Sequence, residues 1–244
     1  MRIDSRLLVL VVLMACGPSA GAPPAPESGS GAAGAPNTLT SAEQAQGWQL
    51  LFDGRSTSGW RGYRMTSMPA GWRVVDGNLA RVEQASDIVT TGQFGNFELS
   101  LEWRLTTPGA NSGIFYRATE AMDQIYFTGP EMQVLDDDVH PDGKSLLTSA
   151  GAAYGLYPAP RGAVKPLGQW NVARVLVDGN HVVHWLNGVK MADYVLGSPE
   201  WLEKVSQSKF AKWPAYGRAA RGHIGLQEHG NPAEFRNIKI RVLP

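Results

Sequence analysis

The sequence predicts an all-β protein, a sandwich of two antiparallel sheets with one short helical insertion. Three observations favour this class. From about Thr40 onward, short apolar runs are separated by Gly, Asn and Asp turn signals. No helical segments alternate regularly with strands, as a parallel sheet would require. The chain has 244 residues, 43% of them hydrophobic, and 28 Gly, which suits one packed domain with many turns.

The clearest strand is segment 97–105, in which apolar and polar residues alternate strictly. A period of two places alternate side chains on one face of a strand, so we expect one face to be buried. The residues expected on that face are Phe97, Leu99, Leu101, Trp103 and Leu105.

Hairpin signals predict the next strands. Asn-Gly and Asp-Gly pairs supply the positive φ angles that tight hairpins need. The predicted hairpins are segment 72–82 with a turn at Asp76-Gly77-Asn78, then segments 171–177, 181–186 and 189–194 with turns at Asp178-Gly179-Asn180 and Asn187-Gly188. Further strands are predicted at 112–117, 131–135, 224–227 and 235–242.

A helical insertion is predicted after residue 197. Ser198 can act as N-cap, Pro199 suits the first helical position, and Glu200 favours the positive end of a helix. Pro214 is expected to end it. The apolar residues expected to form its buried stripe are Trp201, Leu202, Val205 and Phe210.

The N-terminal residues have the composition of an export signal. Arg2 and Arg6 make the start positive, and residues 7–15 form an apolar run. This run is too short to cross a bilayer, which takes about 20 residues, so a signal peptide is the better interpretation. Residues 17–37 are almost entirely Ala, Gly, Pro and Ser, a composition typical of a flexible tether.

The single cysteine, Cys16, lies where this signal ends, in Leu13-Met14-Ala15-Cys16. This segment resembles the lipobox of bacterial lipoproteins, in which the cysteine is lipidated and becomes the first mature residue. The alternative is an ordinary secretory signal with an incidental cysteine. We therefore expect a signal peptide at 1–16, a linker at 17–40 and the sandwich at 41–244, exported and lipid-anchored in the cell envelope, at the periplasm or outer membrane.

Charge and cysteine content exclude several classes. Lys and Arg number 22, as do Asp and Glu, so the net charge is zero. Nucleic-acid binding needs a basic surface and is not expected. One cysteine permits no intrachain disulfide, and if it is lipidated no thiol remains for catalysis.

Segment 131–136 carries the first candidate site residues. Glu131 and Gln133 share one strand face, opposite Met132 and Val134, and could bind a sugar or transfer protons. An ordinary solvated face is the alternative. Asp136 falls on the core face unless a β-bulge turns it, and is a weak candidate for a divalent metal ligand.

Other candidates lie in loops and neighbouring strands. His140 stands beside carboxylates, as a base or metal ligand can. Tyr154 and Tyr157 are able to stack on pyranose rings, although burial of a loop anchor is equally compatible. Arg117 is expected to point inward, towards a sugar or Glu131. The remaining candidates, on or beside one face of the penultimate strand, are His223, Gln227 and His229.

Together these segments resemble the 3-keto-disaccharide hydrolase family, whose fold is a concanavalin-like jelly roll. The similarity spans about residues 48–240. The matching stretches are 48–54, Gly59-Trp60, Asn111-Ser112-Gly113-Ile114, 131–136, 154–158, 184–189, 222–230 and 235–240. Glu228 stands where Asp is commoner in the family.

The resemblance implies cleavage of glycosides oxidised to a ketone at sugar carbon 3. The ketone acidifies the proton on C2, a base removes it, the enolate expels the group on C1, and water adds. Such a site needs a base, stabilisation of the enolate oxygen and an acid. An oxidoreductase that makes the keto-sugar is the implied functional partner.

We assign roles in this chemistry to the candidates as a hypothesis. The base is His140 or Glu131, and His229 is a second acid/base candidate. The keto oxygen is bound by Gln133, Arg117 or a divalent metal near Asp136. Residues expected to contact the sugar are Tyr154, Tyr157, Lys165 and Gln227.

Two other functions remain open, and a third possibility is an inert structural protein tethered in the envelope. A lectin-like binding module could use the same aromatic and polar residues, because a fold does not fix a function. An ordinary glucan hydrolase would need two carboxylates flanking the bond, and Glu131 with Asp136 could provide them only through a bulge.

Overall fold

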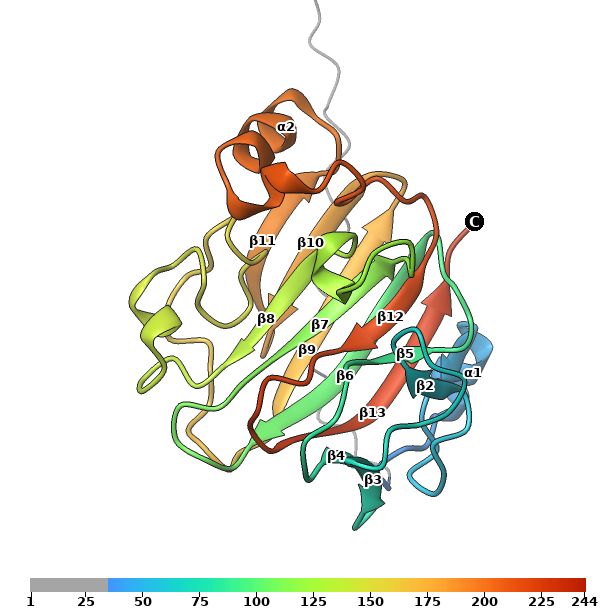
Figure 1. Ribbon diagram of the computed structural model, residues 1–244. Coiled ribbons are helices and arrows are strands. Elements are labelled where there is room, and N and C mark those ends of the chain that lie inside the picture. The colour runs from blue at the N-terminus through green and yellow to red at the C-terminus, as the bar shows by residue number, and fades with distance from the viewer. Residues whose placement is uncertain (1–34) are drawn as a thin grey trace, which may run out of the picture.

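The computed structural model describes residues 35–244, which form two packed antiparallel sheets (Figure 1). The predicted signal peptide, Cys16 and most of the predicted linker lie outside these residues. The larger sheet has the order β11-β10-β9-β6-β13-β4-β3, with β1 also pairing β13. The smaller sheet has the order β2-β5-β12-β7-β8 and lies in front in Figure 1. The predicted sandwich is confirmed.

The strands of the larger sheet are β1 (Trp48–Leu50), β3 (Trp72–Val75), β4 (Asn78–Arg81), β6 (Phe97–Leu105), β9 (Asn171–Asp178), β10 (His181–Leu186), β11 (Val189–Val195) and β13 (Ala233–Val242). Those of the smaller sheet are β2 (Trp60–Gly62), β5 (Ile88–Thr90), β7 (Asn111–Ala118), β8 (Glu131–Leu135) and β12 (His223–Leu226). The helices are α1 (Ser41–Ala45) and α2 (Pro199–Ser206), with 3₁₀ turns η1 (Ile125–Phe127), η2 (Pro141–Lys144) and η3 (Lys209–Lys212).

The core lies between the two sheets, as the alternation predicts. All five expected inward residues of β6 are at most 3% exposed. The hairpin turns follow their sequence signals, because Asp76 and Asn187 adopt φ angles of 49° and 50° and each precedes a glycine with positive φ. Three strands escape prediction: β1, β2 and β5 have three residues each, too few to show a period.

The body begins a few residues before the predicted boundary at 41. Asn37 is 7% exposed, and its backbone N–H donates to Asn237 Oδ1 at 2.5 Å. Its amide oxygen accepts from Asn237 N at 2.8 Å, and its amide nitrogen donates to Gly77 O. Residue 37 therefore belongs to the folded body, held by its own side chain.

The helical insertion forms, with differences in its length and in the residues it buries. Ser198 Oγ accepts a hydrogen bond from Trp201 N, which confirms the predicted cap. Helix α2 ends at Ser206, well before Pro214, and a separate 3₁₀ turn carries Phe210. Leu202 is 38% exposed, so its predicted burial is wrong: Trp201 alone of the α2 residues is buried.

The outer face of the smaller sheet is half covered. Val89 of β5 and Phe115 of β7 point outward and are buried under Ile125 of η1 and Tyr63. The other half of this face is not closed by apolar side chains, and it carries the outward residues of β8. Among the described residues, no helix is long and apolar enough to cross a membrane.

Candidate active site

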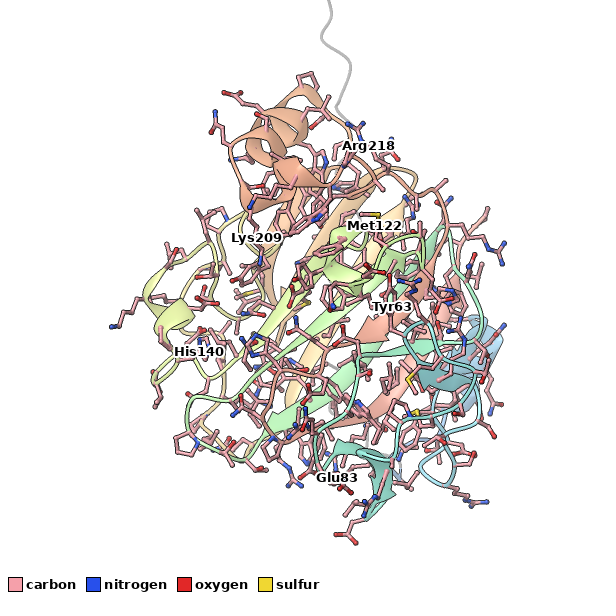
Figure 2. All side chains as sticks on the ribbon, in the orientation of Figure 1. Tyr63, Glu83, Met122, His140, Lys209 and Arg218 are labelled. Carbon is pink, nitrogen blue, oxygen red and sulfur yellow. The ribbon has the colours of Figure 1, made fainter. Side chains whose placement is uncertain are left out.

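A cavity of about 680 Å³ lies on the open half of this outer face. Segments distant in sequence meet around it: β8 and the start of β7, the segment before β5, the residues after β12, and η3 of the insertion. Figure 2 shows Lys209, Tyr63 and His140 on different sides of this front face. Residues that line the cavity include Tyr63, Asp87, Asn111, Tyr126, Glu131, Gln133, Tyr154, Lys209, Trp213, Gln227 and His229.

Glu131 lies in the floor of the cavity, on the outward face of β8. A side chain on Gly113 of the adjacent strand would collide with its carboxyl group, since a Cβ there would lie 2.8 Å from Glu131 Cδ. The absence of a side chain on Gly113 therefore makes the space that the carboxyl group occupies. In the orientation that satisfies both ends of its amide, Gln133 donates to Glu131 Oε1 at 3.1 Å and to Ser112 O at 3.0 Å.

The environment of Glu131 favours its protonated form. Burial, which leaves the residue 5% exposed, raises its pKa to about 8. Lys209 opposes the shift, whereas Asp87 and Asp142 add to it. At neutral pH this carboxyl group holds its proton.

Asp87 is the second carboxyl group in the cavity wall. Its Oδ1 accepts the backbone N–H of Glu228 at 2.8 Å, which fixes the side chain. Burial raises the pKa of Asp87 to about 6, and the hydrogen bond from Glu228 partly offsets the rise. Glu228 is in turn paired with Arg81, an ion pair almost closed to solvent, so the segment that carries Gln227 and His229 is anchored.

Lys209 is the basic group that faces Glu131. Its Nζ lies 4.3 Å from the ring centroid of Tyr154 and 5.4 Å from that of Tyr126, within range of cation–π attraction. Burial lowers its pKa, while Glu131 and Asp142 raise it. The insertion thus places a cation at the cavity wall.

Tyr154 and the two histidines lie along the same side of the cavity. Tyr154 Oη donates to Asp142 Oδ2 at 3.0 Å. His140 Nδ1 accepts the backbone N–H of Asp142 at 3.1 Å, so a neutral His140 carries its proton on Nε2. The rings of His140 and His229 are 6.5 Å apart between centroids, which places His140 behind His229 at the rim.

Asn111 adds an unfilled acceptor to the cavity. The residue is 4% exposed, and its Oδ1 has no hydrogen-bond partner among residues 35–244. An unpaired buried acceptor costs free energy unless a ligand satisfies it. A hydroxyl group of a bound sugar would do so.

Three predicted sugar-contacting residues lie away from the cavity. Arg117 sits at a bulge in β7 with a φ angle of 48°, which turns its guanidinium away to donate to the carbonyl groups of Gly95 and Gly179. Tyr157 stacks on Tyr194 in the core, with 4.7 Å between ring centroids. Lys165 Nζ donates to Trp170 O at 3.0 Å. In the structure, Tyr157 packs in the core, and Arg117 and Lys165 hydrogen-bond to backbone carbonyl groups.

The structure brings no metal ligands to Asp136. Strand β8 pairs regularly with β7 as far as Leu135, so there is no bulge, and Asp136 Oδ2 accepts the backbone N–H of Gly109 at 2.7 Å. Among the described residues, no group of three or more His, Cys, Asp or Glu side chains is arranged to hold a metal ion. Pairing of Asp136 with Glu131 for glucan hydrolysis is excluded by the same geometry. His223 is also turned aside, its Nδ1 hydrogen-bonded to Thr90 O at 2.6 Å.

Several cavity residues were not predicted from sequence. Asp87 precedes β5, which was not recognised as a strand, so nothing indicated which face it would occupy. Lys209 lies in the predicted insertion, whose apolar stripe does not indicate where its charged residues point. Asn111 stands in a motif that matched the family, and that motif was the signal that could have identified it. It begins β7 opposite Leu135 of β8 and lines the same cavity as Glu131.

Comparison with known proteins shows the family to which the chain belongs. Residues 47–241 match the family described as the 3-keto-alpha-glucoside-1,2-lyase-like domain. The chain is 36% identical over 231 residues to a 3-keto-disaccharide hydrolase of Bacteroides thetaiotaomicron, covering 82% of this chain and 79% of that protein.

Solved structures show the same fold. A Parabacteroides distasonis protein, provisionally described as a glycosyl hydrolase, superposes with a TM-score of 0.80 at 33% identity, covering 86% of this chain and all of that one. A second such protein from the same organism gives a TM-score of 0.64 at 31% identity, with 80% and 99% coverage.

Proposed function

The chain belongs to the family of the 3-keto-alpha-glucoside-1,2-lyase-like domain, and from this premise we propose that it cleaves glycosides carrying a ketone at sugar carbon 3. Cleavage proceeds by removal of the C2 proton, expulsion of the C1 substituent and addition of water. The relative from B. thetaiotaomicron is named for hydrolysis of 3-keto-disaccharides, which supports this substrate class.

The observation that carries the proposal is the buried carboxyl group of Glu131 in a polar cavity. Because burial raises its pKa to about 8, Glu131 enters the reaction protonated and can give its proton to the departing glycosidic oxygen. This assignment differs from the base role considered for it from sequence. His140 is also a poor resting base, since its Nδ1 is occupied by Asp142 N and its Nε2 holds the proton.

The remaining polar groups suit the other demands of this chemistry. Lys209 supplies positive charge for the enolate oxygen that forms on C3, a role that the sequence predicts for Gln133, Arg117 or a metal. Asn111 Oδ1, which lacks a partner among the described residues, accepts from a sugar hydroxyl group. Tyr126 and Trp213 offer aromatic surface to the sugar.

The test is a turnover assay on the full chain. A 3-keto-glucoside with a 4-nitrophenyl leaving group is offered beside its unoxidised parent, with and without EDTA. We expect nitrophenol from the keto substrate alone. Binding without release from either would support a lectin-like module and refute the proposal, as would equal release from both. Loss of activity with EDTA would add a metal to the site.

We also propose that the protein acts at the cell envelope, held by lipid on Cys16. The support is the sequence of residues 1–37, mostly outside the described residues. A ketone at C3 must be made before this enzyme can act. A sugar-oxidising dehydrogenase in the same compartment is therefore the class of enzyme that supplies its substrate.

A further inference from the structure

The proposed reaction requires a base that neither Glu131 nor His140 provides in its resting state. Sheet register shows which other group can reach the sugar. Ile88 of β5 pairs with Leu226 of β12, which pairs with Ile114 of β7, which pairs with Met132 of β8. These four residues form one row across the sheet and point into the core.

The neighbouring row therefore points outward, into the cavity. It consists of Asp87, Gln227, Gly113 and Gln133. Asp87 and Gln227 lie one residue outside β5 and β12, and a hydrogen bond from Gln227 N to Gly113 O at 3.0 Å shows that the pairing continues to Gln227. Asp87 and Gly113 lie two strand spacings apart, about 10 Å. Because the Glu131 carboxyl group lies beside Gly113, the two carboxyl groups face each other across Gln227.

In each of these carboxyl groups, one oxygen accepts a hydrogen bond from the protein and the other is available to the substrate. Asp87 Oδ1 is bound to Glu228 N, and Oδ2 accepts no hydrogen bond from residues 35–244. Glu131 Oε1 lies beside Gly113 and accepts from Gln133. The free oxygens are therefore the reactive ones.

We infer that Asp87 and Glu131 are a base and acid pair acting across one sugar ring, Asp87 removing the C2 proton and Glu131 protonating the oxygen that leaves C1. The inference rests on the proposed function. The width of the row leaves room for a sugar ring above Gln227. Asp87 is thus a catalytic residue of the reaction.

The proton and electron transfers balance without another reactant. Asp87 takes the C2 proton, and the C–H electron pair forms the enolate of the C3 ketone. The enolate reforms the ketone with a C1–C2 double bond as the C1–O bond breaks, and the leaving oxygen takes the Glu131 proton. Water then adds to C1 and returns a proton to Glu131, while Asp87, after its proton has exchanged with solvent, protonates C2.

The surrounding charges suit these roles. Asp87 interacts with the Glu228 carboxylate and with Tyr63, shares the cavity wall with His229, and is ionised above a pKa of about 6. Glu131 faces Lys209 and Tyr154 as well as the carboxylates of Asp87 and Asp142, and it is protonated below a pKa of about 8. Between these values the base is charged and the acid is neutral, so kcat/KM should be bell-shaped in pH.

Two isosteric variants separate the roles. With a 3-keto-disaccharide, D87N and E131Q should each lose at least about a hundredfold in kcat/KM. With the 4-nitrophenyl substrate, whose leaving group needs no acid, E131Q should recover most of its activity and D87N should not. In D₂O, E131Q should exchange C2 hydrogen of the disaccharide for deuterium without cleaving it, whereas D87N should not exchange.

Controls keep the outcomes distinct. Asp178→Asn, at an exposed turn, should behave as the wild type. Thermal melting shows whether D87N folds, and D87A with added formate should regain activity if Asp87 is the base. If D87N exchanges the C2 hydrogen, or if formate does not restore activity to a folded D87A, the inference about Asp87 is wrong. The proposed function still stands in that case, provided that the wild type turns over the keto substrate. No wild-type turnover of any keto substrate overturns the proposed function itself.

Discussion

Gly113 matters to the site because it has no side chain. Its missing side chain makes the space that the Glu131 carboxyl group occupies, and its neighbours on β7, Ser112 and Ile114, are fully buried. A misplacement of about 1 Å at a reacting group can cost about a hundredfold in rate.

We therefore predict that G113A lowers kcat/KM by at least about tenfold because it displaces Glu131. Steady-state kinetics on a 3-keto-glycoside measure this. Gly92→Ala is the matched control, since an added Cβ there meets only ordinary contacts, the nearest at 3.5 Å. Unchanged kinetics in a folded G113A would show that the position of this carboxyl group does not limit the reaction.

Glu131 also makes stability depend on pH. Its pKa rises from 4.5 to about 8 on folding, so the unfolded chain releases this proton at lower pH than the folded one. The contribution of Glu131 to the free energy of unfolding is complete below pH 4.5 and is lost as pH rises to about 8. The buried acid that the proposed reaction uses therefore lowers the free energy of unfolding at alkaline pH.

E131Q removes the buried ionisable group at constant shape. We predict that its melting temperature exceeds the wild-type value at pH 9 by at least ~2–4 °C, the shift expected for about 1 kcal/mol in a domain of this size. Near pH 5 the difference should be small. Melting curves at the two pH values measure this, and a pH-independent difference would contradict the elevated pKa.

At the scale of elements, the insertion is attached by a column of aromatic rings. Trp201 of α2 stacks on Tyr194 of β11 at 5.3 Å between centroids and on Tyr216 at 5.8 Å. Tyr216 stacks on Phe210 of η3 at 4.0 Å, and η3 carries Lys209. Packing in this column therefore positions a charged group of the cavity.

W201A should lower stability by about 3–5 kcal/mol, as large-to-small changes at buried aromatic positions do. It should also reduce turnover by moving Lys209. Leu202→Ala is the matched control, because Leu202 lies on the same helix and is 38% exposed, so little change is expected. Equal melting temperatures for the two variants would show that Trp201 does not anchor the insertion.

Sequence predicted the elements well wherever a local signal was long enough. Strands β6, β8 and β10 have the predicted bounds, because their patterns or flanking turns are local features. The predicted direction of the Arg117 side chain was wrong because a β-bulge breaks the alternation in β7. No sequence signal marks that bulge. The proximity of Asp87 to Glu131 depends on the order of four strands, which local patterns do not contain.

At the scale of the molecule, the two outer sheet faces differ in character. The smaller sheet carries the cavity, whereas the larger one carries cross-strand ion pairs such as Arg236 with Glu102 and Arg104 with Glu234. The described chain begins beside that larger sheet, where Asn37 is bonded to Asn237 of β13.

If Cys16 carries the lipid, C16S should move the protein from the membrane pellet to the soluble fraction of fractionated cells. Turnover of a keto substrate by the released protein should match the wild type, since all the residues that line the cavity belong to the described residues 35–244. Retention of C16S in the membrane pellet would contradict the lipid anchor.

Removal of the C2 proton is the step that distinguishes the proposed reaction from ordinary glycoside hydrolysis, and an isotope label at C2 reports on it. We would measure cleavage of a 3-keto-glucoside carrying deuterium at C2, beside the protonated substrate, with the full chain in ordinary water. Elimination through the enolate should release the C2 label to water, and the deuterated substrate should react more slowly where proton removal limits the rate. Cleavage that retains deuterium at C2 would contradict elimination and leave direct displacement at C1 as the mechanism.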